Sequence, residues 1–265
     1  MGSATREALA SSRTALSGSI GTIDLATGES LFKAGRVVGA SSQLLSALAD
    51  PSASAAAKVT LVKAVFGSTV TPQALSLLGS VVAERWSNHG DVLAGIEDLG
   101  LRATAISAPA EVSIESELFA FGTAVSSDAE LELALASKLG LPTAKAGLVE
   151  KLLAGKVSPQ TLVIVRHLVQ QPRGRRIGEL LRHAASVVAD QAGTSIATIT
   201  SAGALAPAQL DRLKKNLSER YGRQLSINLV IDPAVLGGVR VQIGDDVIDG
   251  SIATRLADLR LQLAR

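Results

Sequence analysis

The side chains best suited to acid–base or metal chemistry are three histidines. His89, His167 and His183 have no carboxylates at metal-ligand spacing, and the chain has no cysteine to complete a zinc site. Scattered histidines of this kind are more typical of surfaces and helix packing. The turn Gly244-Asp245-Asp246 resembles an acidic metal loop, but aspartate is also a favoured turn residue and no second acidic cluster supports a site. We therefore expect no metal and no other cofactor.

Motifs for nucleotide binding and nucleophilic catalysis are also missing. The pair Gly237-Gly238 is not part of a GxxxxGK[ST] loop, and no G-x-S-x-G elbow occurs. The basic residues Arg173, Arg175, Arg176 and Arg182 could meet an acidic partner, although a solvated loop is the simpler alternative. Aromatic residues make up 2% of the chain, so stacking on single-stranded nucleic acid is not expected. We expect no catalytic residues and no nucleic-acid partner, so the chain should not be an enzyme.

The composition favours a helical protein of the cytoplasmic side. Of the 265 residues, 47% are hydrophobic, and alanine, leucine and valine supply most of them, which favours closely packed helices. The absence of cysteine excludes disulfides and thiol catalysis and fits a reducing compartment. No apolar run approaches the ~20 residues of a spanning helix. The start MGSATREALASSR lacks the pattern of a signal peptide. We expect a soluble protein with no direct membrane insertion.

Helical periodicity covers most of the first two thirds of the chain. The pattern predicts helices over about 5–17, 31–49, 55–66, 72–86, 91–105 and 179–191, and a break marked by Gly18, Gly21, Thr27 and Gly28. The segment 31–82 also matches 118–169 without a gap at an offset of 87 positions, mostly at apolar residues. Leu31-Phe32 falls on Leu118-Phe119, and Pro72-Gln73 falls on Pro159-Gln160. This pattern is typical of one duplicated domain.

The last third predicts a small α+β unit. Strand patterns cover 194–201, 224–231, 239–243 and 247–249, and an amphipathic helix covers 207–221. A last helix would begin after Ser251. The fold class is therefore mainly α, with a duplicated helical bundle followed by a β-α-β-β-β-α unit. The expected domains are 1–97, 98–192 and 193–265.

The C-terminal pattern is similar to the signature of a known family, the delta subunits of F-type ATP synthases, which include the mitochondrial oligomycin-sensitivity-conferring protein. The matching residues are Asp232, Pro233, Gly237, Gly238, Gly244, Asp245, Asp249, Gly250 and Ser251. Residues 155–162, in the second copy, resemble the helical N-terminal domain of that family. The two copies resemble the longer delta subunits of actinobacterial type.

This resemblance implies a non-catalytic connector in the peripheral stalk, or stator, of the ATP synthase. A family member links the catalytic head, through N-terminal segments of the alpha subunit, to the membrane-anchored b subunit, and thereby supports proton-driven ATP synthesis. Such a protein would lie peripherally on the cytoplasmic face of the cell membrane. A general helical adaptor unrelated to ATP synthase is the alternative, and an unrecognised enzyme built on the α+β unit is a second one.

Two apolar stripes are candidate partner-binding residues. Leu9 and Leu16 would help form the head-binding groove, although the same stripe would serve equally as core. Leu256, Leu259 and Leu263 would close the C-terminal unit and contact the b subunit. Of the two helical copies, one would bind the head, while the other acts as a spacer or contacts a second alpha segment.

Overall fold

The computed structural model describes residues 2–137, 140–235, 237–244 and 246–250. The chain divides into two compact units, Met1–Val188 and Ala189–Arg265, and each has a separate core. The first is helical and the second is built on a sheet, which confirms the predicted fold class of mainly α with a small α+β part.

The helical unit contains a succession of short helices. Their bounds are α1 Ser3–Ser17, η1 Ile20–Thr22, α2 Leu25–Ala40, α3 Ser42–Ala49, α4 Ala55–Phe66, α5 Pro72–Ala83, α6 His89–Ile106, α7 Ile114–Ser127, α8 Ala129–Ala136, α9 Pro142–Leu153, α10 Pro159–Gln170 and α11 Ile177–Gln191. Side-chain caps begin several of them. The Ser54 side chain accepts from the N–H of Ala57, and that of Thr71 accepts from the N–H of Ala74 before the first-turn Pro72.

The predicted single helix over 31–49 is wrong. The structure has two helices there, α2 and α3, which meet at Ser41, whose side chain caps α3 by accepting from the N–H of Leu44. The predicted break at Thr27 and Gly28 is also wrong, because α2 begins at Leu25 with the Asp24 side chain as its cap. Gly28 is buried within α2 and lies against Thr104 of α6. This glycine therefore permits a close helix crossing and does not interrupt the helix.

The helix bounds repeat at the offset found in the sequence. Shifting α3, α4 and α5 by 87 positions places them on α8, α9 and α10 with identical bounds. Shifting α1 places it on 90–104, inside α6, and shifting α6 places it on 176–193, around α11. Thus α6 is the last helix of the first copy (α1–α6) and the first helix of the second copy (α6–α11). The predicted boundary between 97 and 98 falls inside α6.

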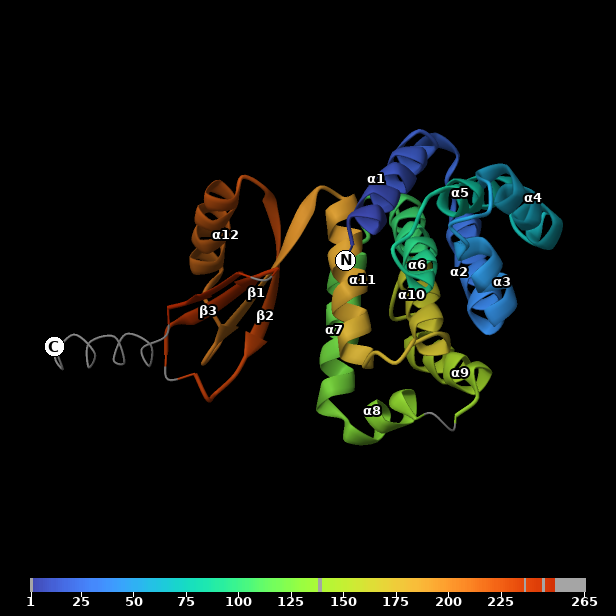
Figure 1. The fold of residues 1–265 in the computed structure, drawn as a ribbon. Helices are drawn as coiled ribbons and strands as arrows, with labels where there is room; N and C mark the ends of the chain where they lie inside the picture. Colours follow the sequence, from blue (N-terminus) through green and yellow to red (C-terminus); the bar gives the residue numbers. More distant parts are fainter. Residues whose placement is uncertain (1, 138–139, 236, 245, 251–265) are drawn as a thin grey trace, which may run out of the picture. The chain divides into compact units, whose positions relative to one another are not determined.

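Helix α6 lies centrally in the helical unit and contacts α1, α2, α3, α5 and α10 (Figure 1). Its residues from Gly95 to Thr104 are all buried. Ile96, Leu99 and Ala103 belong to the apolar core that α1 to α5 build around Leu31, Leu78 and Val81. Packing in this core fixes the position of the shared helix.

The second unit contains a mixed four-stranded sheet and one described helix. Their bounds are β1 Thr194–Ser201, α12 Pro207–Tyr221, β2 Gln224–Ile231, β3 Val239–Ile243 and β4 Asp246–Asp249, and the strand order is β2-β1-β3-β4. β1 and β2 are parallel, with Ile199 opposite Leu229, and α12 provides the crossover that a parallel pair needs. β3 pairs antiparallel with both β1 and β4.

One face of the sheet forms the core of this unit. The buried residues Ile199, Leu225 and Val241 pack with Leu217 of α12. Gly222 ends α12 in the left-handed conformation, with φ 64°, which glycine adopts readily. The predicted last helix lies outside the described residues.

Candidate partner-binding site

The two helical copies meet where α2 lies against both α6 and α10. A Cβ atom added to Gly28 would clash with Thr104 of α6, and one added to Gly100 of α6 would clash with the ring of Phe32. The Phe32 ring then stacks on His167 of α10, with ring centroids 4.1 Å apart and an interplanar angle of 15°. Small residues thus bring the helix backbones close together, so that an aromatic residue of the first copy reaches the second.

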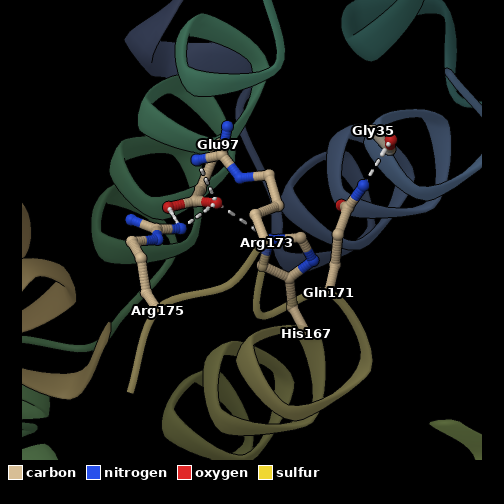
Figure 2. A network of polar contacts seen from close by, with 6 residues as sticks. All are labelled: Gly35, Glu97, His167, Gln171, Arg173 and Arg175. Carbon is tan, nitrogen blue, oxygen red and sulfur yellow. Dashed lines mark hydrogen bonds and ion pairs between the residues drawn. The ribbon is translucent and has the colours of Figure 1, made fainter. Parts of the chain in front are cut away.

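A charged network joins the same three elements to the loop after α10 (Figure 2). Glu97 of α6 is 4% exposed, and its carboxylate accepts from Nη2 of Arg173 at 2.9 Å and from Nη2 of Arg175 at 2.7 Å. His167 Nε2 lies 3.8 Å from Glu97 Oε2. Gln171 donates from Nε2 to the carbonyl of Gly35 in α2 at 3.0 Å. The carboxylate is thus held between two guanidinium groups from the loop after α10.

These neighbours determine the charge state of the network. Burial alone would raise the pKa of Glu97, but His167, Arg173 and Arg175 outweigh it and lower that pKa to about 2. Burial lowers the pKa of His167, and nearby Arg36 and Arg173 act in the same direction against the attraction of Glu97. Glu97 is therefore ionised and His167 neutral at pH 7. The network stabilises the contact between the two copies.

The network also decides between the two alternatives for the basic cluster, an acidic partner or a solvated loop. Arg173 and Arg175 bind an acid of their own chain, so they are neither free for an acidic partner nor simply solvated. Arg176 and Arg182 are exposed. Sequence reasoning missed Glu97, and the available signal was the pair Glu97-Asp98 inside an otherwise apolar helical stretch.

The histidines do not come together as a metal site. His167 is buried in α10, while His89 and His183 are exposed on α6 and α11. Among the described residues, no group of three or more histidine, aspartate or glutamate side chains could hold a metal ion. In the acidic turn after β3, Gly244 has φ 57° and Asp245 lies outside the described residues.

The predicted groove residues of α1 lie in the first core. Leu9 is 7% exposed and Leu16 is 1% exposed, and both pack in the cluster shared with α5 and α6. Leu256, Leu259 and Leu263 lie outside the described residues, so their predicted contact with a partner stays a prediction.

The signature residues that the structure describes form the turns of the sheet unit. Asp232 donates its N–H to the carbonyl of Ser201 at 2.9 Å, and its side chain accepts from the N–H of Ala234 at 2.9 Å, which fixes the turn that contains Pro233. Gly237 and Gly238 have φ values of 101° and 81°, which explains why glycines occupy this reversal. Asp249 ends β4, and the N–H of the following Gly250 donates to the carbonyl of Val239 at 3.0 Å. Ser251 lies outside the described residues.

An accessible helical surface lies over the seam between α1 and α5. Their core faces are buried through Leu9, Leu16 and Val81, while Ala10 and Ser17 on α1 are exposed. On α5, Ser80 is half-buried, and Gly79 faces Val59 of α4. Ser11 donates to Glu84 across the seam. The exposed residues Ala10 and Ser17 on this surface have small side chains.

None of the described helices is long and apolar enough to span a membrane.

The chain is similar to known proteins over its full length. The family model for the ATP synthase delta (OSCP) subunit matches residues 101–263. The chain is 57% identical over 264 residues to the ATP synthase subunit delta of Leifsonia xyli subsp. xyli, with 100% of both chains covered. It is 36% identical over 272 residues to that of Streptomyces griseus subsp. griseus, again with 100% of both covered.

Two further similarities cover less of the chain. The chain is 38% identical over 241 residues to the ATP synthase subunit delta of Kineococcus radiotolerans, which covers 90% of this chain and 87% of the relative. One chain of the cryo-EM structure of the Toxoplasma gondii mitochondrial ATP synthase hexamer is similar at a TM-score of 0.42 and 19% identity, over 63% of this chain and 95% of that one. The latter likeness is too low to add to the assignment.

Proposed function

Because the chain belongs to the ATP synthase delta (OSCP) subunit family, we propose that it connects the catalytic head of an ATP synthase to the membrane-anchored b subunit in the peripheral stalk. It is a non-catalytic subunit of that complex. The observation that carries the proposal is the 57% identity to an ATP synthase subunit delta over the full length of both chains. The proposed role is to keep the head from turning with the rotor, so that rotation drives ATP synthesis.

The division of the chain into two units supports a connector. Each unit has its own core, so each can offer a separate binding surface. Two surfaces on one chain raise the effective concentration of each partner for the other, which suits a protein under mechanical load. The helical unit would bind the head and the sheet unit would bind the b subunit.

The partner of the helical unit would be an N-terminal segment of the alpha subunit. An amphipathic segment could place its i, i+3, i+4 and i+7 anchors along the seam between α1 and α5. In this proposal Leu9 and Leu16 shape the groove from below, since both are core residues of α1. Leu256, Leu259 and Leu263 remain the proposed contact with the b subunit.

Binding to the b subunit would place the chain on the cytoplasmic face of the cell membrane as a peripheral protein. Membrane fractionation of cells with and without the b subunit tests this location. The chain should sediment with membranes only when the b subunit is present.

Reconstitution tests the function itself. ATP synthase assembled without this chain should hydrolyse ATP but couple proton flow poorly to ATP synthesis, and the added full chain should restore coupling. Pull-downs with the full chain should retain both the isolated head and the soluble part of the b subunit. Full coupling without the chain would refute the proposal.

A further inference from the structure

The two helical copies differ in charge along one pair of equivalent helices. At the offset of 87 positions, residues 27–49, in α2 and α3, correspond to residues 114–136, in α7 and α8. The segment 27–49 contains one glutamate, one lysine and one arginine, which gives it a net charge of +1. The segment 114–136 contains four glutamates, one aspartate and no lysine or arginine, which gives it a net charge of −5. The second copy is therefore acidic at a place where the first copy is slightly basic.

The fold itself uses some of these acids and leaves others exposed. Glu117 accepts from the N–H of Ser158 at 3.1 Å and from its hydroxyl at 2.6 Å, and the Asp128 side chain caps the start of α8. Glu130 and Glu132 of α8 are exposed, and neither forms an ion pair with another described residue. These two carboxylates are available to a partner.

Two leucines close to these acids are also exposed. Leu133 of α8 is 71% exposed, and Leu141, directly before α9, is 70% exposed. Leu133 lies on the side of α8 opposite the buried Leu135, since successive helical residues are about 100° apart. Lys145 of α9 donates from Nζ to the carbonyl of Leu135 at 2.8 Å, which places the first turn of α9 against the end of α8. Leu141 precedes Lys145 by about one turn, so the two exposed leucines belong to the same end of the helical unit.

We call Glu130, Glu132, Leu133 and Leu141 the α8 surface. In Figure 1, α8 lies at the edge of the helical unit, next to α7 and α9. The surface thus combines exposed apolar side chains with exposed negative charge.

Folding of the helical unit does not account for the two leucines. Leu133 corresponds to Ser46 in the first copy, and Leu141 corresponds to Ser54. Ser54 caps α4 by accepting from the N–H of Ala57, whereas α9 has no side-chain cap. Serine at this position usually stabilises the start of a helix. The second copy therefore lacks a stabilising contact and exposes an apolar side chain in its place, as a binding surface would.

The helix α8 also gives less of its surface to its own bundle than α3 does. Leu45 of α3 packs against the first core, and its counterpart in α8 is the exposed Glu132. Leu48 and Ala49 of α3 are both buried, whereas Leu135 is the one buried residue among the eight of α8. Most of α8 is thus accessible to another molecule.

The chemistry of the α8 surface selects its partner. Exposed leucines beside carboxylates match a helix that carries an apolar stripe at i, i+3 and i+4 and lysine or arginine next to it. A second copy of this chain is a poor fit, because two α8 surfaces would bring like charges together. Anionic lipids would be repelled for the same reason.

We propose that the α8 surface docks a basic amphipathic helix of another protein. This site belongs to the second helical copy and shares no residue with the seam between α1 and α5 or with the sheet unit. It does not depend on the proposed contacts with the head and the b subunit, so its failure would leave those contacts unaffected. The second copy then has a binding surface of its own and is more than a spacer.

The first experiment reports on α8 alone. The chain has no cysteine, so Ala134→Cys can carry an environment-sensitive fluorophore at an exposed position of α8, and Ala47→Cys carries it at the equivalent exposed position of α3. The probe is a synthetic helical peptide of leucine, lysine and alanine with its leucines in one stripe. Titration should change the fluorescence of the full chain labelled at position 134 and leave the chain labelled at position 47 unchanged. No response at position 134 would overturn the proposal.

Variants of the labelled chain test the two components of the surface. Leu133→Ser with Leu141→Ser restores the residues of the first copy and should weaken binding about tenfold or more, because two apolar contacts are lost. Glu130→Gln with Glu132→Gln should weaken binding about fivefold and reduce its dependence on salt. The matched control Glu150→Gln, at an exposed carboxylate of α9, should change the affinity less than about twofold. Undiminished binding by either double variant would overturn the proposal.

Two controls separate docking from simpler effects. A peptide of the same composition, with its leucines spread around the helix, should bind about fivefold more weakly or worse. Equal binding would show a general attraction of cations and overturn the proposal. The urea midpoint of the double serine variant, followed by circular dichroism, should not fall below that of the wild type, since both leucines are exposed. A lower midpoint would show that the leucines serve the fold instead.

The second experiment tests the surface in the assembled ATP synthase. A photo-cross-linker on Ala134→Cys should join the chain to a segment of one other subunit that is rich in lysine or arginine, and the same cross-linker on Ala47→Cys should not. A cross-link to a second copy of this chain, or none from position 134, would overturn the proposal. Binding of the head and the b subunit, measured on the same preparation, would still decide the proposed function.

Discussion

The substitution Glu97→Ala is the most direct test of how the two helical copies are held together. It removes the carboxylate that accepts from Arg173 and Arg175 and leaves both guanidinium groups beside the buried ring of His167. We expect a large loss of stability in the helical unit. Removing the carboxylate of an exposed ion pair should lower the free energy of unfolding only slightly.

Two considerations give the size of the effect. Removing one partner of a buried ion pair typically costs about 3–5 kcal/mol, because the other charge is left without compensation. Independently, lowering the pKa of Glu97 from 4.5 to about 2 corresponds to about 3 kcal/mol of stabilisation of its charged form. The two values agree, so we expect Glu97→Ala to lower the free energy of unfolding by about 3 kcal/mol at pH 7.

Urea unfolding followed by tryptophan fluorescence measures this loss. The only tryptophan, Trp86, lies in the first core, so its signal reports on the helical unit. The matched control is Glu150→Ala, which removes a 3.4 Å pair with Arg166 at a carboxylate that is 46% exposed and should cost less than about 1 kcal/mol. A loss for Glu97→Ala no larger than that of the control would show that the network does not hold the copies together.

Lowering the pH should reduce the difference in free energy of unfolding between the wild type and Glu97→Ala. The pKa of Glu97 is lower in the folded chain than in the unfolded chain, so its contribution is complete above about pH 4.5. It is lost as the pH falls towards the folded value of about 2. If the difference in free energy of unfolding between the two proteins stayed constant from pH 7 to pH 3, Glu97 would not have a lowered pKa in the folded chain.

Three further changes test separate contacts by the same fluorescence assay. Gly100→Ala should destabilise by about 1–3 kcal/mol, because the added methyl group meets the ring of Phe32; an unchanged midpoint would mean that the helices can separate at no cost. Ser158→Ala should cost about 1 kcal/mol by removing the α10 cap and its bond to Glu117. Burial lowers the pKa of His167, so wild-type stability should fall as the pH drops below about 6.5. His167→Phe should reduce this dependence of stability on pH. An equal dependence in both proteins would show that His167 does not titrate on unfolding.

Local signals predicted much of the secondary structure. The predicted bounds of α4, β1 and α12 equal the observed ones, because caps, a first-turn proline or a terminal glycine mark their ends. The start of α2 was missed because Gly28 has the character of a helix breaker, whereas its role depends on Thr104 in a distant helix. Glycines that permit close packing and glycines that end helices have the same sequence signal.

The network around Glu97 could not be predicted in the same way. Its members are separated by 76 and 78 positions, and their pairing depends on the packing of α6 against α10. The basic run after α10 was recognised as a candidate for an acidic partner, but its partner lies in the same chain. The sequence left an acidic partner and a solvated loop open as alternatives, and only the fold identified Glu97 as the acid.

The duplication and the shared helix together determine how firmly the two helical copies are joined. Two complete copies joined by a linker would move as independent domains, since interfaces between domains permit relative motion by default. Here Ile96 and Leu99 of α6 lie in the core of the first copy, while Glu97 of the same helix pairs with Arg175 in the loop after α10 of the second copy. Separating the copies would break the apolar core if α6 moved with the second copy, or the buried ion pair if α6 stayed with the first. The shared helix α6 therefore joins the two copies more firmly than a linker would.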